Sequence, residues 1–390
     1  MSQPETDVLD PTWWQSDPQD SYRELLSYPG LWRDEKSGFL LAARHEDLLA
    51  VERDPETFNS RAHYRVEAST DEQTMISHDD PTHLAQRRMV NRRFTPRAVR
   101  QHADHYTSMV SKLVDEAVAE NTRNGSVEVI DALAAQLPGR VTGELIGFGQ
   151  DAWREVKSWS ERQMRIDRRY VDVVVLNDLM SSIEEWATVM ADLLPKRFAE
   201  PADDLFSDWL AAGMEPHTMV QETGLMIAGG AETTRTVIAH GLHKLANHPD
   251  IWEFLAEDPA RVTPAVEELI RWVTPLNNMF RVASVDTELA GTAIAKGDRI
   301  ALVYPAANRD PRVFERPDEF DVTRDPNPHI AFGHGTHFCL GANLARLELR
   351  LLFEELTSRL TNLRVVTEPD IEPNIFARAV RTFHLSFDLR

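Results

Sequence analysis

The chain contains a single cysteine, Cys339, which stands in the glycine-rich run FGHGTHFCLG at positions 332–341. Apolar residues recur at helical spacing after this run, so Cys339 is expected just before the N-terminus of a core helix. The free amide N–H groups and the dipole of such a helix favour a thiolate over a thiol. Gly333, Gly335 and Gly341 would let the backbone approach a flat ligand closely. The predicted chemistry is that of a thiolate beside such a ligand.

Other uses of a lone cysteine are weaker. A buried and inert side chain is the ordinary alternative, because free cysteine is among the most buried residue types. A zinc site needs several Cys or His ligands at short spacing, and only His334 and His337 are near. A protease nucleophile would need a partner histidine and a familiar local signature, which the sequence lacks. The glycine frame around Cys339 favours ligand binding.

A second candidate site is the run AGGAETTR at positions 228–235, inside a long apolar segment from Pro216 to Asn247. The segment is periodic and stops ahead of His248-Pro249, which predicts one long buried helix. Two adjacent glycines inside a helix cost on the order of 1 kcal/mol each relative to alanine, so something must compensate. Close packing against another helix is the ordinary explanation. The run also places an acid, Glu232, next to a hydroxyl, Thr233.

The elements that must position these residues are mostly helices. Amphipathic helices are predicted over His102–Asn121 and Asp131–Ile146, and strands over Gly38–Ala43, over Phe383–Leu389 and in a hairpin at Glu288–Tyr304 that turns at Lys296-Gly297-Asp298. The chain has no repeat at a fixed period, and its 17 Gly and 22 Pro are scattered. This favours one continuous domain. We expect a mainly helical α+β fold with small sheets near both ends.

The charge balance excludes several classes of function. The 390 residues include 42 Lys and Arg against 63 Asp and Glu, a net charge of −21, which repels nucleic acid and anionic membranes. One cysteine forms no internal disulfide, which favours a reducing cytosol. No apolar window is long enough to span a membrane, and the acidic N-terminus lacks a signal-peptide pattern. We expect a cytoplasmic protein.

The run at 332–341 closely resembles the haem-binding signature of the cytochrome P450 monooxygenases. The defining positions are filled by Phe332, Gly333, Gly335, His337, Cys339 and Gly341. Three other segments resemble family landmarks in the family's order: His83 with Arg87, the run at 228–235, and Glu268-x-x-Arg271. The resemblance covers essentially the whole chain. It implies a single cytochrome P450 haem-thiolate domain over residues 1–390, with haem between the long distal helix and the helix after the cysteine.

The resemblance also implies residue roles. Cys339 would be the thiolate ligand of the iron of haem b, and Phe332, Gly333 and Gly341 would contact the cofactor. The expected partners of the haem propionates are His83, Arg87, Arg281 and His337; for His83 and Arg87 a solvated basic face is the ordinary alternative. Glu232 would relay protons and Thr233 would hydrogen-bond dioxygen. Glu268 and Arg271, otherwise an ordinary surface ion pair, would join a meander near Asn308–Phe320.

A haem-thiolate with a buried acid and hydroxyl is suited to splitting O2. The chain has no flavin or nicotinamide fingerprint and no cysteine cluster, so electrons would come from an external ferredoxin and ferredoxin reductase. A basic cluster could attract that acidic partner, although a merely solvated face explains it equally well. Its residues are Arg88, Arg92, Arg93, Arg97, Arg100, Arg346 and Arg350. The expected assembly is a monomer.

The expected reaction is hydroxylation or epoxidation of a hydrophobic small molecule. Carried over from the family, the candidate pocket residues are Ile227, Ala228, Ala231, Leu276, Asn277, Asn278, Met279, Ile375 and Phe376, followed by the stretch to Ala379, with a lid over Leu176–Trp186. Details of the motifs look most like actinobacterial hydroxylases of sterol side chains and lipids; a polyketide, terpenoid or peptide natural product is the other substrate class. A haem-thiolate gas or redox sensor, or a lipid-binding protein without turnover, would need no Glu232-Thr233 pair.

Overall fold

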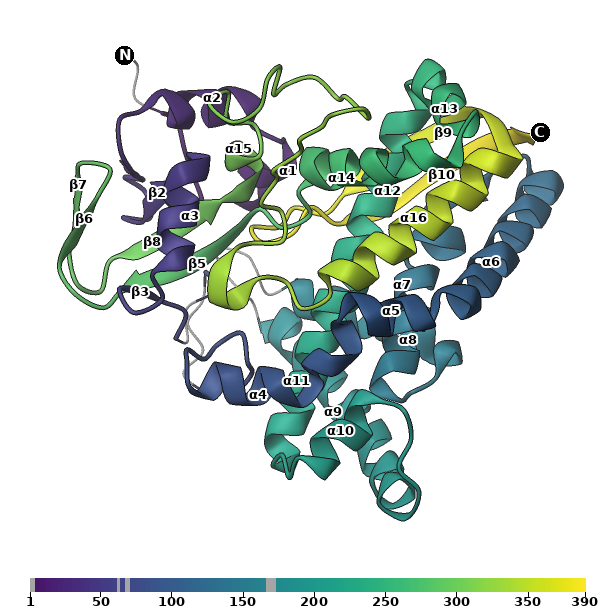
Figure 1. Cartoon of the computed structure of the whole chain (residues 1–390), viewed down its shortest axis with the longest axis horizontal. Coiled ribbons are helices and arrows are strands. Elements are labelled where there is room, and N and C mark those ends of the chain that lie inside the picture. Colours follow the sequence, from purple (N-terminus) through teal and green to yellow (C-terminus); the bar gives the residue numbers. More distant parts are fainter. Residues whose placement is uncertain (1–3, 62–63, 67–70, 166–172) are drawn as a thin grey trace.

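The computed structural model describes residues 4–61, 64–66, 71–165 and 173–390, and most of these lie in helices (Figure 1). The α-helices are α1 (Pro11–Gln15), α2 (Gln19–Ser27), α3 (His45–Arg53), α4 (Thr82–Val90), α5 (Pro96–Gln101), α6 (Ala103–Asn124), α7 (Gln136–Ile146), α8 (Trp153–Met164), α9 (Val173–Ala199), α10 (Leu205–Ala211), α11 (Pro216–Ile227), α12 (Thr233–Ala246), α13 (Pro249–Ala256), α14 (Val262–Val273), α15 (Tyr304–Ala307) and α16 (Ala342–Arg359). Shorter turns are η1 (Asn91–Phe94), η3 (Gln150–Ala152), η5 (Pro259–Arg261) and η6 (Gly335–His337), and two π-helical turns, η2 (Ile130–Ala134) and η4 (Ala228–Glu232). The predicted mainly helical fold is confirmed.

The small sheets combine distant parts of the chain, so the expectation of sheets near both ends holds only in part. The strands are β1 (Trp32–Arg33), β2 (Leu40–Ala42), β3 (Phe58–Asn59), β4 (Val127–Glu128), β5 (Asn278–Ala283), β6 (Thr287–Leu289), β7 (Thr292–Ile294), β8 (Arg299–Val303), β9 (Leu360–Ile371) and β10 (Val380–Leu389). Five of them form one sheet in the order β1-β2-β8-β5-β3, in which β2 and β8 run parallel and the other pairs antiparallel. The second sheet, in the order β4-β10-β9, carries the C-terminus.

The predicted hairpin at Glu288–Tyr304 is wrong in its turn. Strands β6 and β7 pair with each other around Ala290-Gly291, whereas β8 pairs with β2 and β5. Ala290 and Gly291 have φ of +50° and +77°, the left-handed pair that a tight two-residue turn requires. Ala290 gives no such signal in the sequence, so Lys296-Gly297-Asp298 looked like the better turn. In the structure that segment leads into β8.

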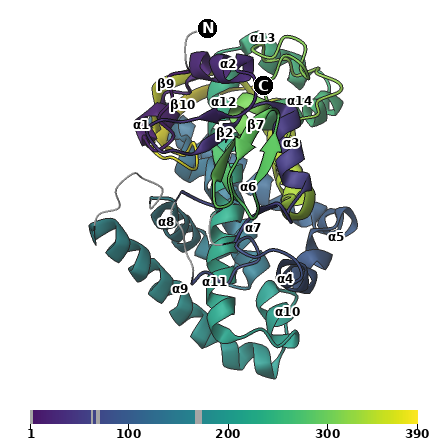
Figure 2. The same ribbon diagram turned by 90° about the vertical axis from the view of Figure 1, so that its left-hand side faces the viewer.

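The long central helix forms largely as predicted. Elements α11, η4 and α12 follow one another as a column through the middle of the molecule (Figure 2). Pro216 occupies the first turn, where its missing N–H costs nothing, and α12 ends at Ala246, ahead of Pro249. The sequence did not predict the widening of the column into a π-helical turn over Ala228–Glu232, a feature often found at functional sites.

The main core fixes α12 relative to α16. Side chains of α6, α12, α14 and α16 share one cluster that includes Leu113, Leu242, Leu269 and Leu352. The loop that leads into α16 passes beside α3 (Figure 1). At the C-terminus, Phe383, Leu385 and Phe387 face the core as the alternation predicted, while Leu389 is exposed. The core therefore holds the cysteine loop and the glycine-containing turn in a fixed relation.

Candidate functional site

The loop that carries Cys339 is closed by its own backbone. The amide of Cys339 donates to the carbonyl of Phe332 at 2.9 Å, and that of Gly333 to the carbonyl of Ile330 at 2.9 Å. Gly333 and Gly335 have φ of +66° and +68°, where any other residue would be strained. A Cβ on Gly335 would lie 2.3 Å from the carbonyl oxygen of Glu52. These two glycines thus allow close packing on α3, which differs from the flat-ligand role expected.

The surroundings of the Cys339 sulfur have opposing effects on the pKa of its thiol. Burial raises the pKa of the Cys339 thiol. The backbone amides of Gly341 and Ala342, at the start of α16, lower the pKa, as do the guanidinium groups of Arg87 and Arg346. The expected help from the helix N-terminus is therefore present, but burial outweighs it. Such a thiol needs a cation at its sulfur to stay ionised.

Two histidines offer unpartnered nitrogens beside this loop. His83 is buried on α4, and its Nδ1 lies 2.9 Å from Asp80 Oδ1. The ring of His337 lies 4.5 Å from that of His83, centroid to centroid. Within the described residues the buried Nε2 atoms of both rings have no hydrogen-bond partner within 3.5 Å, although that of His337 faces Asp79 Oδ1 at 4.0 Å. Burial lowers the pKa of His337 to about 4. A neutral imidazole carries one N–H, which His83 directs from Nδ1 to Asp80, so its Nε2 donates to an anion only when the ring carries a second proton. The neutral ring of His337 can place its one N–H on Nε2 and donate from there.

Arg281 and Arg87, both expected to contact the propionates, differ in their hydrogen-bond partners. Arg281 is buried on β5, where its Nη1 donates to the carbonyl of Phe280 at 2.8 Å. Arg87 donates from Nη2 to the carbonyl of Phe338 at 2.6 Å and from Nη1 to that of Thr336 at 3.4 Å. Arg87 thus ties α4 to the cysteine loop in this structure, whereas Arg281 adds a buried positive charge.

The glycine pair of η4 serves two purposes. A Cβ on Gly230 would lie 2.6 Å from Thr142 Oγ1, so this glycine allows α7 to pack closely, which was the ordinary explanation. A Cβ on Gly229 would meet no atom within 4 Å. The Thr233 hydroxyl donates to the Gly229 carbonyl at 2.8 Å, which fixes its orientation beside the π-helical turn.

Glu232 is a buried acid with one unsatisfied oxygen. Ser160 Oγ donates to its Oε2 at 3.3 Å, and Arg235 Nη1 lies 3.4 Å from the same atom. Its Oε1 has no hydrogen-bond partner among the described residues. Burial raises the pKa of Glu232, and the nearby Arg235 lowers it. The carboxyl can therefore hold a proton nearer neutral pH than an exposed glutamate can.

A series of charged side chains links this acid to the surface. Arg235 Nη1 donates to Glu161 Oε1 at 2.7 Å, and Lys157 Nζ lies 3.2 Å from the same oxygen. Lys157 also lies 3.2 Å from the exposed Asp131. Nothing in the sequence indicated a role for Ser160, Glu161 or Arg235. Arg235 lay inside the quoted run, but α8 is about seventy residues away, and no local pattern signals the contact.

Part of the predicted pocket forms one apolar wall. Ala228, Phe376 and Ala377 pack with Met164, which the sequence analysis missed, and Leu276 and Met279 lie against them. Ile227 and Ala231 pack in the cluster of α8 to α11, and Ile375 packs with the N-terminal sheet. The predicted lid, Leu176–Trp186, lies within α9.

Asn277 and Asn278 hold the C-terminal loop. Asn278 Nδ2 donates to the carbonyl of Ile375 at 2.9 Å, and Asn277 Nδ2 to the same oxygen at 3.2 Å. The Oδ1 atoms of both amides are buried without a hydrogen-bond partner among the described residues. The Nδ2 atoms of these two side chains therefore position the apolar wall. Their Oδ1 atoms remain available to accept a hydrogen bond from another group.

Glu268 and Arg271 form a fully buried ion pair on α14. Arg271 Nε and Nη2 each lie 2.7 Å from a carboxylate oxygen of Glu268. Arg271 also donates to the carbonyls of Asn308, Pro317 and Glu319, which lie in the segment that precedes the cysteine loop. Glu268 further accepts from Arg324 and Asn327, two partners that the sequence analysis missed. Burial and six partner groups, which include the backbone amide of Asp321 at 2.9 Å from Glu268 Oε1, distinguish this pair from an ordinary surface ion pair.

The basic cluster is partly committed to structure. Arg93 donates to Asp208 at 2.5 Å and to Asp203 at 2.6 Å, and its side chain is 9% exposed. Arg92 pairs with the same Asp208. Arg346 stacks on Phe332 at 4.5 Å and binds Glu267, and Arg350 binds Glu354 at 2.9 Å. Exposed members for which the described residues show no ion pair are Arg88, Arg97 and Arg100.

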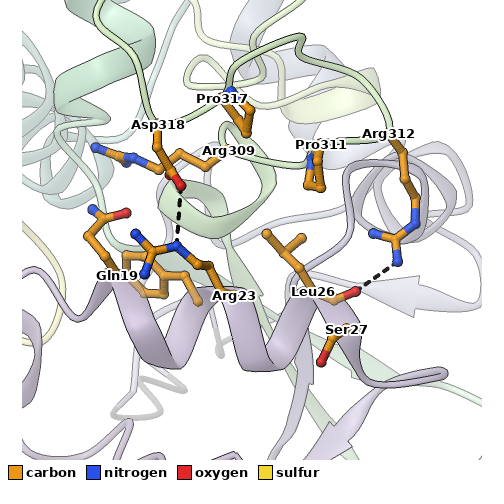
Figure 3. A pocket seen from close by; sticks show the side chains of 10 residues that line it. Gln19, Arg23, Leu26, Ser27, Arg309, Pro311, Arg312, Pro317 and Asp318 are labelled. Atoms are coloured by element: carbon orange, nitrogen blue, oxygen red, sulfur yellow. Dashed lines mark hydrogen bonds and ion pairs between the residues drawn. The ribbon is translucent and has the colours of Figure 1, made fainter.

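A separate hollow of about 290 Å³ lies between α2 and the segment 309–318 (Figure 3). Leu26 and Pro311 form part of its lining, and Arg23 Nε reaches Asp318 across it at 3.2 Å. None of the predicted site residues lines this hollow.

Known proteins share this arrangement along the whole chain. The Cytochrome P450 family profile matches residues 202–383. A steroid C26-monooxygenase of Mycolicibacterium smegmatis is 34% identical over 95% of this chain and 92% of its own length. The chain is a cytochrome P450. A steroid C26-monooxygenase of Mycobacterium tuberculosis is also 34% identical, over 95% of this chain and 93% of its own. The structure of Mycobacterium marinum cytochrome P450 CYP268A2 in complex with pseudoionone superposes with a TM-score of 0.88, at 31% identity, covering 99% of this chain and 100% of that one.

Cytochromes P450 are haem b monooxygenases, and the residues of this one suit that cofactor. Cys339 presents a sulfur that needs a cation. The buried Arg281 suits the propionates, as do the buried Nε2 atoms of His83 and His337, for which the described residues provide no hydrogen-bond partner. As a cytochrome P450 the chain uses O2 and a hydrophobic substrate. Among the described residues, no helix combines the length and apolar character that crossing a membrane requires.

Proposed function

We propose that this cytochrome P450 hydroxylates the aliphatic side chain of a steroid or of a similar lipid, with residues 1–390 acting as one haem-thiolate domain. The observation that carries the substrate is the relationship to steroid C26-monooxygenases, which extends over 95% of the chain. The wall formed by Met164, Ala228 and Phe376 supports it, because an apolar surface suits an alkyl side chain.

In this proposal Cys339 binds the iron, and His83, His337 and Arg281 hold the propionates. Bound haem supplies the one-electron and O2 chemistry that protein side chains lack. Arg87 keeps the cysteine loop in place through its bonds to the carbonyls of Phe338 and Thr336.

The acid and the hydroxyl have separate tasks. Glu232, whose pKa is raised by burial, takes up protons from the surface through the charged groups of α8 and releases them inside the protein. The Thr233 hydroxyl donates to the Gly229 carbonyl, so its oxygen remains an acceptor for a hydrogen bond from the substrate side. A sensor or a lipid-binding protein would need neither group.

Electrons come from outside the chain in this proposal, through a ferredoxin and its reductase. Arg88 is exposed on α4, and Arg97 and Arg100 are exposed on α5, which directly precedes α6. The same basic set includes Arg92, Arg346 and Arg350. Their positive charge attracts an acidic partner despite the net charge of −21.

The test compares two steroids. Cholesterol carries carbon C26, whereas testosterone lacks the side chain and serves as the matched control. With a surrogate ferredoxin and reductase, we expect cholesterol to shift the Soret band and to yield a product hydroxylated on the side chain. A shift with no product and no added NADH consumption would favour the lipid-binding alternative. No response to either steroid would contradict the substrate proposal.

A further inference from the structure

The C-terminal end of α3 lies directly against the loop that precedes Cys339. A Cβ on Gly335 would lie 2.3 Å from the carbonyl oxygen of Glu52, and one on Gly333 would lie 3.1 Å from Glu52 Oε1. Arg53 Nε donates to His334 Nε2 at 3.2 Å. Backbone and side chains of α3 therefore support three consecutive residues of the loop.

Glu52 also faces the buried arginine of the candidate site. Its side chain is 2% exposed and that of Arg281 is 6% exposed, and Arg281 Nη2 lies 3.7 Å from Glu52 Oε1. The hydroxyl of Tyr304, at the start of α15, donates to the same oxygen at 2.7 Å. Glu52 Oε2 is buried without a hydrogen-bond partner among the described residues. One carboxyl thus joins α3, α15 and β5.

The neighbours of this carboxyl favour its charged form. Burial raises the pKa of Glu52 and outweighs Arg281, the Tyr304 hydroxyl and the backbone amide of His334, each of which lowers it. Burial and the nearby Glu52 raise the pKa of Tyr304, so this residue stays a hydroxyl and remains a donor. A buried carboxyl without partners would be costly, so the Tyr304 hydroxyl at 2.7 Å and the Arg281 guanidinium at 3.7 Å indicate a site built to hold a negative charge.

We propose that Glu52 is a positioning residue for haem, which acts through Arg281 and through the loop before Cys339. Arg281 presents its positive charge to a propionate in the proposed haem site. The charge of Glu52 offsets part of that positive charge, and a fixed negative charge near haem disfavours the added electron of the ferrous state. Glu52 therefore lowers the reduction potential of the bound cofactor. No substrate takes part, so the test stands apart from that of steroid hydroxylation.

The first experiment is a spectroelectrochemical titration of the substrate-free holoenzyme. Glu52→Gln keeps the shape and removes the charge, and we expect the equilibrium to move about three- to tenfold towards ferrous haem, where tenfold corresponds to 59 mV. Glu52→Asp keeps the charge, so its potential should stay near that of the wild type. Glu46→Gln removes a charge from the exposed side of the same helix, where solvent screens it, and should shift nothing.

The second experiment measures positioning without electron transfer, as the rate at which haem passes to apomyoglobin. We expect faster transfer from Glu52→Gln and from Tyr304→Phe, which loses only the hydrogen bond to Glu52. A variant that folds with native circular dichroism but retains no haem would support the proposal equally. Unchanged potential and transfer in Glu52→Gln, or a shift as large in Glu46→Gln, would overturn it. Should Glu52→Gln not fold, unchanged transfer in Tyr304→Phe would overturn it.

Discussion

Glu232 and Thr233 are adjacent in the chain but lie in different chemical surroundings. Glu232 is buried against Ser160 and Arg235, with a raised pKa, whereas Thr233 bonds to the backbone of the π-helical turn. The turn places the two side chains on neighbouring faces of the central column. Glu232, which in the proposed function exchanges protons with the charged side chains of α8, thus lies next to the Thr233 hydroxyl, whose orientation is fixed.

We expect Glu232→Gln to slow product formation about 100-fold, because general acid catalysis contributes about 10²- to 10⁴-fold. Thr233→Val should consume NADH but divert electrons away from product. The measurement is product formed per NADH consumed with the surrogate ferredoxin pair. Thr236→Val is the control, since the Thr236 hydroxyl is buried without a hydrogen-bond partner in the described part of the chain. A wild-type yield from Glu232→Gln would contradict the proposed role.

Residue type and spacing predicted the site only where the chemistry is local. Cys339 and Glu232 stand in short runs whose glycines mark unusual backbone, so the sequence pointed to both. Ser160 and Glu52 carry no such mark. They reach the site because α8 and α3 pack against distant segments, and a buried contact between remote elements leaves no pattern in one sequence. Arg87 was expected to contact a propionate, and in the structure its guanidinium binds carbonyls of the cysteine loop.

At the scale of elements, α14 holds the segment that leads to the cysteine loop. The Glu268–Arg271 pair is completely buried and binds three carbonyls of that segment through Arg271. Breaking one partner leaves an uncompensated charge inside the protein. The pair therefore supports the loop from one side as α3 does from another.

We expect Glu268→Gln to lower the free energy of unfolding by about 3–5 kcal/mol, the usual cost of leaving a buried charge unpaired. Urea unfolding, followed by tryptophan fluorescence, measures it. Asp388→Asn is the control, because it breaks the exposed Arg364–Asp388 pair and should leave the transition in place. Equal midpoints for Glu268→Gln and the wild type would show that the pair is dispensable.

Glu348 on α16 predicts a pH dependence. Burial raises the pKa of this carboxyl to about 8. Between its ordinary pKa and 8 the folded protein keeps a proton that the unfolded chain has released, so stability falls as pH rises. The loss is at most about 1.4 kcal/mol per pH unit for one group. Glu348→Gln should therefore gain stability over the wild type between pH 6 and pH 8 in urea unfolding. Parallel pH profiles of the two proteins would refute this origin.

Periodicity predicted several long elements but missed the 12-residue strand β9, and it predicted the short elements poorly. The helices α6 and α16 and the strand β10 carry enough apolar repeats to fix their burial. The turn at Ala290-Gly291 depends on two backbone angles that alanine does not signal. Within the π-helical turn, Gly230 packs closely against Thr142, a contact that only the folded molecule contains.

Across the whole molecule, the arginines of the basic cluster fall into two groups. Some are buried in ion pairs and others are exposed to solvent. Arg93 is buried in ion pairs that hold α10, whereas Arg88 is exposed on α4. We expect Arg88→Ala to raise the KM for ferredoxin at low salt and to leave the unfolding midpoint unchanged, because screening weakens such attraction. Arg93→Ala should lower the midpoint instead. The reverse pattern in ferredoxin titrations and thermal melts would contradict this division.

The most direct measurement of the central claim is the absorption spectrum of the reduced protein with carbon monoxide. Thiolate ligation through Cys339 predicts a band at roughly 450 nm in the wild type. Cys339→Ala should lose that band even where haem is retained. A band near that wavelength in Cys339→Ala, or none in the wild type with haem bound, would contradict the assignment of Cys339 as the haem ligand.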